Sequence, residues 1–457
     1  MDQNIVCQDA LFNDWPKADA IIGNPPFLGG SRVRLELGDK YVERIFEKFS
    51  DVKDKVDFCV YWFRLAHENL NKTGRAGLVG TNSISQGFSR RASLEYIVNN
   101  GGIIHDAIST QVWSGQANVH VSLVNWQYLK PPEYVLDHEI VKNINSSLKS
   151  ETDVSNAVKL KVNLNQSFKG VQPTGKDFLI SEKKVENWIQ KNTKNNQVLK
   201  LFVSASDLAS NKNGEPSRWI IDFNDFSLED ASTYKEPFDH VNFFVKPQRE
   251  NNRDQKTREY WWLFPRARPA MRQAIELLAL YFAVPRHSKW FIFIPCKLDW
   301  LPADSTTVVA SDDFYVLGIL TSDVHRQWVK AQSSTLKGDT RYTHNTCFET
   351  FPFPQTAIAK LTQQIRQGMI DLHEYRTAQM EAKQWGITKL YNAFFDEPAS
   401  QLHKLHKKLD ALVLKAYGFK KDDDILEKLL DLNLALAEKE KNGENIVGPW
   451  AIDNPPK

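Results

Sequence analysis

The chain has 457 residues, of which 42% are hydrophobic and 25% are charged, and its formal net charge is +2. Such values are typical of a globular protein of about three domains, and no apolar stretch approaches the roughly 20 residues of a membrane span. The near-zero net charge excludes no class of partner, and four scattered cysteines with no secretory signal pattern predict a reduced, cytoplasmic protein without a membrane segment.

Residues 1–130 are predicted to form an α/β domain. Strands are expected within residues 18–24, 74–83, 101–109 and 118–129, and a buried helix within residues 56–70. Strands that alternate with helices predict a mostly parallel, doubly wound sheet. Because such sheets carry their chemistry beyond the carboxyl ends of the strands, we single out Asn24 and Asn82, which follow two of them.

The stretch Asn24-Pro25-Pro26-Phe27 ends the first predicted strand. Two prolines fix the backbone and remove two donors, so the carbonyls of Asn24 and Pro25 stay free beside the Asn24 side-chain oxygen. These acceptors suit an exocyclic amine, because accepting both of its hydrogens takes the nitrogen lone pair out of conjugation. Phe27 offers a face for a heteroaromatic ring. The pattern indicates methylation of an amino group on a planar base by a sulfonium donor, although a purely structural proline turn is an alternative.

The remainder of the chain divides into three predicted parts. Polar, irregular sequence in residues 131–198 indicates a linker with some helix. Residues 199–354 are rich in aromatic residues and short strand patterns, which predicts a mixed, β-rich domain. From residue 355 to residue 457, apolar residues at three- and four-residue spacing predict a helical domain.

One segment of the mixed region concentrates positive charge. Residues 246–272 hold eight Lys or Arg against three acids, a local charge of +5. Cations neutralise phosphates, and arginines and amides read base edges, so the segment is a candidate nucleic-acid contact. A solvated loop is the alternative. His287, His325 and His344 lack the spacing of metal ligands, and we predict no metal site.

Together these motifs resemble the amino-methyltransferases that act on DNA adenine, and most closely the type IIG restriction–modification enzymes of the MmeI kind and related bacteriophage-defence methyltransferases. The resemblance covers nearly the whole chain and follows the family's order of motifs. It rests on NPPFLGG, GRAGLVGTNSISQG, VWSGQANVHVSLVNW, SRWIIDF, VKPQRE, WWLFPRARP, GILTSDVHRQWV, RYTHNTCFETFPFP and LDALVLKAYGF.

The resemblance implies a fold and a set of site residues. The fold would be part of a Rossmann-like methyltransferase sheet dependent on S-adenosylmethionine, followed by a mixed α+β target-recognition domain and a C-terminal helical segment. Asn24, Pro25, Pro26 and Phe27 would grip and stack an adenine flipped out of duplex DNA. Asp9 and Asn24 would contact S-adenosylmethionine. DNA contacts would fall on Arg90, Arg91, Lys246, Gln248, Arg249, Arg253, Arg258, Arg266, Arg268, Lys337 and Arg341.

The sequence departs from the family pattern in one respect. The glycine-rich strand and turn that approach the methyl donor come before the catalytic motif in the family, and here only 23 residues precede Asn24. We therefore expect a split enzyme whose partner chain supplies the donor site, a fragment, or an inactive remnant. Two other functions stay open: a DNA specificity module without turnover, and a methyltransferase for protein glutamine, against which Phe27 in place of tyrosine counts.

Overall fold

The computed structural model describes residues 5–52, 56–113, 119–150, 152–333, 335–336, 339–356 and 358–454. By its internal contacts the chain divides into two compact units, Met1–Val154 and Ser155–Lys457. The finer division at residues 130, 198 and 354 stays a prediction. No helix within the described ranges is long and apolar enough to span a bilayer.

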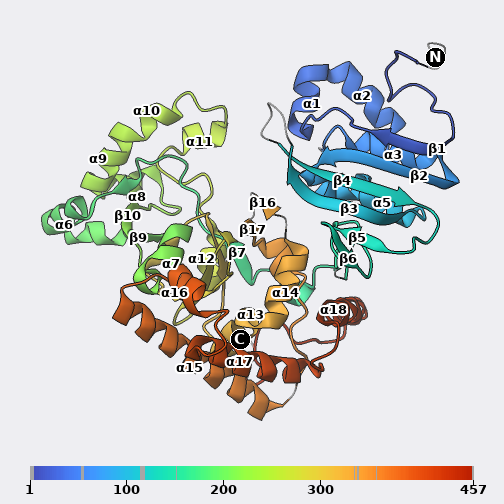
Figure 1. Ribbon diagram of the computed structural model, residues 1–457. Coiled ribbons are helices and arrows are strands. Elements are labelled where there is room, and N and C mark those ends of the chain that lie inside the picture. Colours follow the sequence, from blue (N-terminus) through green and yellow to red (C-terminus); the bar gives the residue numbers. More distant parts are fainter. Residues whose placement is uncertain are drawn as a thin grey trace. The chain divides into compact units, whose positions relative to one another are not determined.

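The first unit is built on a six-stranded sheet in the order β1-β2-β4-β3-β5-β6 (Figure 1). Its strands are β1 (Ala18–Gly23), β2 (Leu70–Thr81), β3 (Ile103–Val112), β4 (His120–Gln127), β5 (Tyr134–Leu136) and β6 (Glu139–Val141). The β1–β2 and β3–β5 pairs are parallel, whereas β4 runs antiparallel to both β2 and β3. The prediction of a mostly parallel sheet is therefore wrong, because the link between β3 and β4 is too short for a parallel crossover.

Helices pack against this sheet because their apolar residues fall on one side. They are α1 (Gly30–Leu37), α2 (Asp39–Lys48), α3 (Val60–Asn69), the short 3-10 helix η2 (Asn82–Ser85), α4 (Gly87–Ala92) and α5 (Leu94–Asn99). The helix predicted in residues 56–70 is α3, and its Phe63 stacks on Trp126 of β4 with ring centroids 5.6 Å apart. Both rings are fully buried, so this contact lies in the core of the unit.

Among its described residues, the second unit contains three small sheets, in the orders β14-β9-β10-β8, β13-β11-β15-β7 and β12-β17-β16. Their strands are β7 (Ser167–Lys169), β8 (Leu179–Ile180), β9 (Leu199–Val203), β10 (Arg218–Ile221), β11 (Tyr281–Pro285), β12 (His287–Ser288), β13 (Ile294–Cys296), β14 (Trp300–Pro302), β15 (Thr306–Val309), β16 (Thr335–Leu336) and β17 (Asp339–Arg341). The short helices among them are α6 (Glu182–Lys191), α7 (Ala205–Ser210), α8 (Leu228–Ser232), α9 (Lys235–Phe244), α10 (Lys246–Arg249), α11 (Gln255–Glu259) and α12 (Pro269–Ile275). Short strands punctuated by proline and asparagine thus give the mixed region that the sequence predicts.

Six further helices, which follow the strands of the first two small sheets in the chain, are described in the second unit. They are α13 (Phe314–Thr321), α14 (Asp323–Gln332), α15 (Ala359–Lys383), α16 (Ile387–Phe394), α17 (Gln401–Tyr417) and α18 (Ile425–Lys441). Helices α13 and α15 approach closely at Gly318, where a Cβ atom would lie 2.9 Å from the side chain of Ile365. The predicted order of an α/β sheet, a mixed region and C-terminal helices is confirmed.

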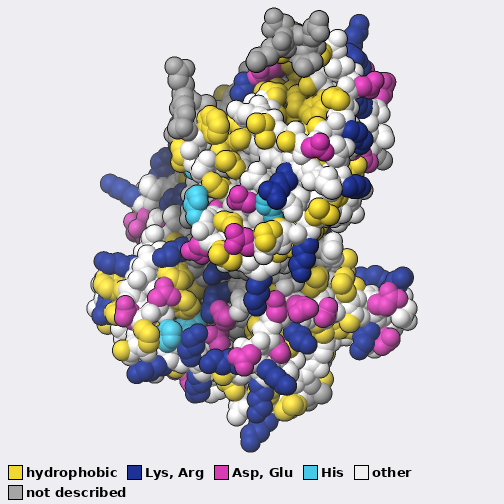
Figure 2. Space-filling view, turned by 45° about the vertical axis from the view of Figure 1, so that its right-hand side comes forward, with side chains coloured by type: hydrophobic (Ala, Val, Ile, Leu, Met, Phe, Trp, Pro, Cys, Tyr) yellow, Lys and Arg dark blue, Asp and Glu magenta, His cyan; other side chains and the backbone are white. Residues whose placement is uncertain are grey.

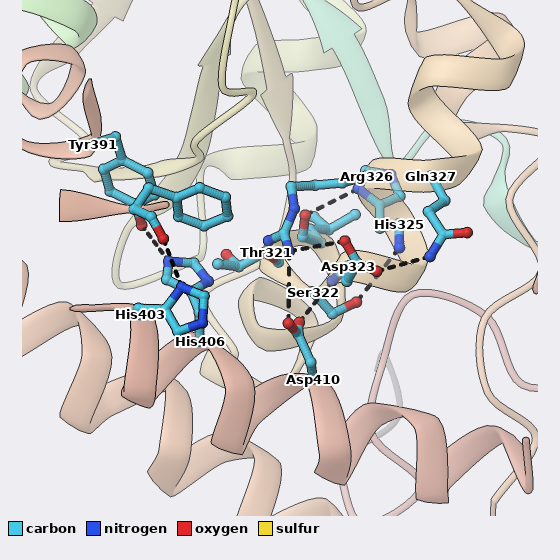
Figure 3. A network of polar contacts seen from close by, with 12 residues as sticks. Thr321, Ser322, Asp323, His325, Arg326, Gln327, Tyr391, His403, His406 and Asp410 are labelled. Carbon is cyan, nitrogen blue, oxygen red and sulfur yellow. Dashed lines mark hydrogen bonds and ion pairs between the residues drawn. The ribbon is translucent and has the colours of Figure 1, made fainter. Parts of the chain in front are cut away.

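A partly buried polar network joins α14 to the C-terminal helices (Figure 3). Arg326 lies 3.1 Å from Asp323 and 3.6 Å from Asp410 of α17, and the backbone N–H of Asp323 donates to the same Asp410 carboxylate at 2.7 Å. Beside it, the Tyr391 hydroxyl lies 2.7 Å from Nε2 of His406. Such contacts require one arrangement of the helices, so the mixed region and the C-terminal helices form one packed unit.

Helix α18 also holds the first residues of this unit. The amide of Asn433, fully buried, accepts from the N–H of Val158 at 2.9 Å and donates to the carbonyls of Val158 and Thr350 at 2.9 and 2.7 Å. Two turns of helix further on, the Glu440 carboxylate accepts from the N–H groups of Lys161 and Val162. Segments nearly 280 residues apart in the chain are therefore bonded directly.

Candidate active site and nucleic-acid interface

The turn Asn24–Phe27 lies at the carboxyl end of β1, as the sequence predicts. Asn24 and Pro26 are exposed, Pro25 is buried and Phe27 is half-buried. The buried proline anchors the turn, while the Asn24 amide makes no hydrogen bond to any residue that the structure describes. An exposed amide without an internal partner on a stiff turn is free to bind a ligand.

Phe27 has an aromatic neighbour that sequence reasoning missed. Its ring lies edge-to-face with that of Trp113, with centroids 6.3 Å apart and planes at 85°. Trp113 follows β3, and its N–H donates to the carbonyl of Val119 at 2.9 Å. The backbone just after Phe27 is held too, because the N–H of Phe58 donates to the carbonyl of Leu28 at 2.9 Å. Two strand ends therefore bring two rings together beside the turn.

A second polar cluster fixes the end of β2, where the sequence places Asn82. The Asp57 carboxylate accepts from the hydroxyl of Thr81 at 2.5 Å and also from the hydroxyl of Ser83. The N–H of Asp57 donates to Ser89 at 3.1 Å. Asn82 itself begins η2 and is half-buried. Asp57 thus holds the residues on both sides of Asn82.

Asp9 is exposed and is held by two hydrogen bonds. Its carboxylate accepts from the N–H of Leu11 at 3.0 Å and from the hydroxyl of Tyr41 at 2.9 Å. Partial burial, together with the Asp9 carboxylate, raises the pKa of Tyr41 to about 12, so the phenol stays a donor. Each carboxylate oxygen retains further lone pairs for an external donor.

The described residues among those predicted to contact DNA fall into three groups by exposure. Arg91, Gln248, Arg253, Arg258 and Arg266 are exposed, and Lys246, Arg268 and Arg341 are half-buried. Lys337 lies outside the described residues. Arg90 and Arg249 are buried, at 6% and 3% exposure. The face in Figure 2 shows Lys and Arg interspersed with Asp and Glu, so surface charge alone does not mark an interface.

The two buried arginines have internal roles, which corrects their prediction as DNA contacts. Arg249 donates to the carbonyls of Trp261, Leu263, Pro173 and Thr174 at 2.6–3.2 Å. Arg90 pairs with Glu95 at 3.1 Å and with Asp153 at 3.5 Å. In the same basic segment, Arg272 pairs with Asp222 at 2.8 Å. Part of the local charge of +5 therefore makes hydrogen bonds and ion pairs within the protein.

The structure brings together a group of four cations that the sequence does not show as a run: Lys169, Arg268, Arg286 and Arg341, hereafter the cation cluster. Arg286 and Arg341 come together because β12 pairs with β17 and because the N–H of Tyr342 donates to the Arg286 carbonyl at 2.8 Å. Arg268 lies against the end of β7, where its Nε donates to the Gly170 carbonyl at 3.2 Å. Lys169 and Arg286 were missed because they lie outside the basic segment of residues 246–272.

A cavity of about 760 Å³ opens beside the cation cluster. Its lining includes Lys169 and Arg268 of the cluster, and also Arg266, His344 and the rings of Tyr260 and Phe264. Burial lowers the pKa of His344, so this side chain is neutral near pH 7. Within the described ranges, no group of three or more His, Cys, Asp and Glu residues is arranged to hold a metal ion.

Comparisons with known proteins agree with this arrangement. Residues 1–136 match the family model "MmeI, DNA-methyltransferase domain", and residues 149–355 match "MmeI, target recognition domain". DNA methyltransferase A of Bacillus subtilis (strain 168) is 25% identical over 467 residues, which cover 95% of this chain and 51% of that protein.

A solved structure of the type IIL restriction-modification enzyme MmeI in complex with DNA has the same fold. It matches with a TM-score of 0.73 at 20% identity, over 92% of this chain and 57% of that one. The chain thus spans little more than half the length of these relatives. It belongs to the MmeI family of DNA methyltransferases, with that family's methyltransferase domain followed by its target recognition domain.

Proposed function

We propose that the chain is the catalytic and recognition portion of an adenine-specific DNA methyltransferase that uses S-adenosylmethionine in a restriction–modification or phage-defence system. The observation that carries this proposal is the turn after β1. There the Asn24 amide is exposed and has no partner among the described residues, beside the half-buried ring of Phe27. The two matched domain models support the coarser assignment to DNA methylation.

In the proposed reaction, the side-chain oxygen of Asn24 and the carbonyl of Pro25 accept the two N–H groups of a flipped adenine. This draws the nitrogen lone pair out of the ring and makes the amine a nucleophile without a strong base. Phe27 holds the base by ring contact, and the Trp113 ring fixes Phe27 edge-on. S-adenosylmethionine, when bound, supplies a methyl group on a positively charged sulfur.

Asp9 fits a role in holding the donor. Its carboxylate is exposed, and its orientation is set by Tyr41 and Leu11. It can therefore accept an additional hydrogen bond from the amino group of the donor's adenine without losing its internal partners. The family resemblance places an acidic residue at this position.

A partner chain that completes the donor site fits the open side of the sheet. Among the described residues β1 pairs only with β2, and the other edge of β1 has no neighbouring strand. Ile22 on this edge strand is 89% exposed and Leu35 of α1 is 82% exposed. Exposed edges with apolar side chains are surfaces that proteins normally cover.

The test is Asn24→Ala, with a partner chain co-expressed from the neighbouring gene, in a host that lacks adenine methylation. N6-methyladenine in host DNA is measured by mass spectrometry, and DNA affinity is measured on the purified chain. We expect methylation to be lost while DNA affinity changes less than twofold. The matched control is Asn99→Ala, which removes an exposed amide at the end of α5. Equal methylation by the Asn24→Ala protein would remove Asn24 from the reaction.

The wild-type chain decides between an enzyme and a specificity module without turnover. The cation cluster lies in the second unit and does not depend on the turn after β1, so recognition can persist without catalysis. Binding to duplex DNA without methylation, even with a partner chain co-expressed from the neighbouring gene, would favour the module.

A further inference from the structure

We infer that the cation cluster, Lys169, Arg268, Arg286 and Arg341, is a preformed site for a backbone phosphate of duplex DNA beside the 760 Å³ cavity. The inference rests on the proposed DNA substrate and adds to it a specific anchoring site. Two of its residues, Lys169 and Arg286, lie outside the basic segment of residues 246–272.

The backbone brings these side chains together, so the site exists before a ligand arrives. Lys169 on β7 pairs with Thr307 of β15, and Pro285 at the end of β11 pairs with Thr306 of the same strand. Arg286 follows directly, and its N–H donates to the Ser305 carbonyl at 2.9 Å. Strands β7 and β11 therefore deliver Lys169 and Arg286 to the same end of β15.

Arg268 is placed from another direction by an unusual backbone conformation. Its φ angle is +59°, which a residue other than glycine adopts only when its surroundings hold it there. In this conformation its Nε bonds the carbonyl of Gly170, which follows Lys169. Position 170 must be glycine, since a Cβ would lie 2.2 Å from the Ala303 carbonyl. Close backbone packing thus holds the second cation beside the first.

The charges in this group are poorly compensated. Asp304 is the one carboxylate that acts on three of the four cations, and its backbone carbonyl accepts from Arg286 at 3.0 Å. The pKa of Lys169 is lowered mainly by burial, and further by the neighbouring cations. The Nε atoms of Arg286 and Arg341 are buried and have no hydrogen-bond partner among the described residues. Among the described residues, Asp304 is the one acid set against these four cations, and some of their donors are unused, which is unfavourable until an anion binds.

A phosphodiester is the anion that this arrangement suits. Guanidinium groups donate in parallel to phosphate oxygens, and an ammonium adds a point charge. Contacts of this kind position DNA but do not read its sequence. The exposed Arg266 and the cavity beside the cluster leave room for the adjacent nucleotide.

The test is the salt dependence of DNA binding by the whole chain. Fluorescence anisotropy gives Kd for two 30-base-pair duplexes of unrelated sequence from 50 to 300 mM KCl. Lys169→Met removes a cluster charge with no hydrogen bond to other described residues, and Lys360→Met removes one exposed charge at the start of α15. Arg341→Met is a second cluster variant.

One phosphate contact contributes about 0.9 to the slope of log K against log salt, which is about eightfold in Kd at 0.1 M salt. We expect the slope of log K against log salt to be smaller by about 0.9 in each cluster variant, and the affinity for both duplexes to be about eightfold lower. Lys360→Met should bind both duplexes as the wild type does. Slopes equal to wild type in both cluster variants, with unchanged thermal unfolding, would overturn the inference. Loss of affinity for one duplex only would indicate base reading and would also overturn it.

Inorganic phosphate separates the two sources of the anion. The site binds free phosphate instead of DNA if three results are found together. Inorganic phosphate binds the wild type with a Kd below about 1 mM, this binding is lost in Lys169→Met, and the cluster variants bind DNA with the same salt dependence as the wild type. The outcomes also separate this inference from the proposed function. If the wild type methylates DNA but the cluster variants keep the wild-type salt dependence of DNA binding, only the phosphate site is contradicted. If the cluster variants change that salt dependence but the wild type does not methylate DNA, only the proposed reaction is contradicted.

Discussion

The buried guanidinium of Arg249 allows a prediction that distinguishes a structural arginine from a DNA contact. It is 3% exposed, donates to four carbonyls and lies 4.9 Å from the ring of Phe178. Burial lowers its pKa to about 10, so it is still charged at pH 7. Arg249→Met keeps much of the side-chain volume but leaves four carbonyls without a donor.

The expected loss follows from these contacts. Hydrogen bonds to a charged group contribute about 1.5–3 kcal/mol each, but four bonds to one guanidinium are not additive, and the cost of burying the charge is recovered on removal. We therefore expect the free energy of unfolding of the second unit to fall by about 3–5 kcal/mol, as when one partner of a buried charge pair is removed.

Urea unfolding followed by tryptophan fluorescence measures this loss, with Trp261 and Trp262 as nearby reporters. Arg253→Met is the matched control, because Arg253 is exposed in the same segment and makes no hydrogen bond or ion pair with described residues. It should change stability by less than about 0.5 kcal/mol. The structural reading is refuted if Arg249→Met is as stable as Arg253→Met and weakens DNA binding more.

Three other changes test the packing of the second unit by urea unfolding. Asn433→Ala removes three buried hydrogen bonds and should cost about 2–4 kcal/mol, and a loss below 1 kcal/mol would mean that α18 is not held there. Gly170→Ala forces a Cβ against the Ala303 carbonyl and should cost about 1–3 kcal/mol, whereas unchanged stability and DNA affinity would contradict this close approach. Burial lowers the pKa of His325 to about 4, below its unfolded value of about 6.5. The unfolded chain then takes up the proton first, so stability is full above pH 6.5 and falls towards pH 4; an equal pH slope in His325→Gln would refute this.

The turn at residues 24–27 could be predicted because its information is local. An apolar run, two prolines and an aromatic residue specify a strand end and a stiff exposed amide without reference to the rest of the chain. A helix within residues 56–70 and helices after residue 355 follow from apolar spacing in the same way. Strand direction in the first sheet was not predictable from strand patterns alone, because antiparallel pairing of β3 and β4 depends on the length of their link.

The interface residues were only partly predictable, because charge density along a sequence does not measure availability. Arg249 lies within a basic run, but its guanidinium donates to backbone carbonyls of two separate segments and is not available to DNA. Lys169 and Arg286 lie in unremarkable sequence and meet only through strand pairing with β15. The same holds for Trp113, which reaches Phe27 from another strand. Which of these residues meet, and which are available to a ligand, depends on contacts between segments that are distant in the sequence.

The bonds from Asn433 and Glu440 to residues 158–162 have a consequence for synthesis on the ribosome. The backbone at the start of the second unit cannot find these partners until α18 has left the exit tunnel. During most of translation the second unit is therefore incomplete, while the first unit, a compact unit by its internal contacts, is able to fold before it.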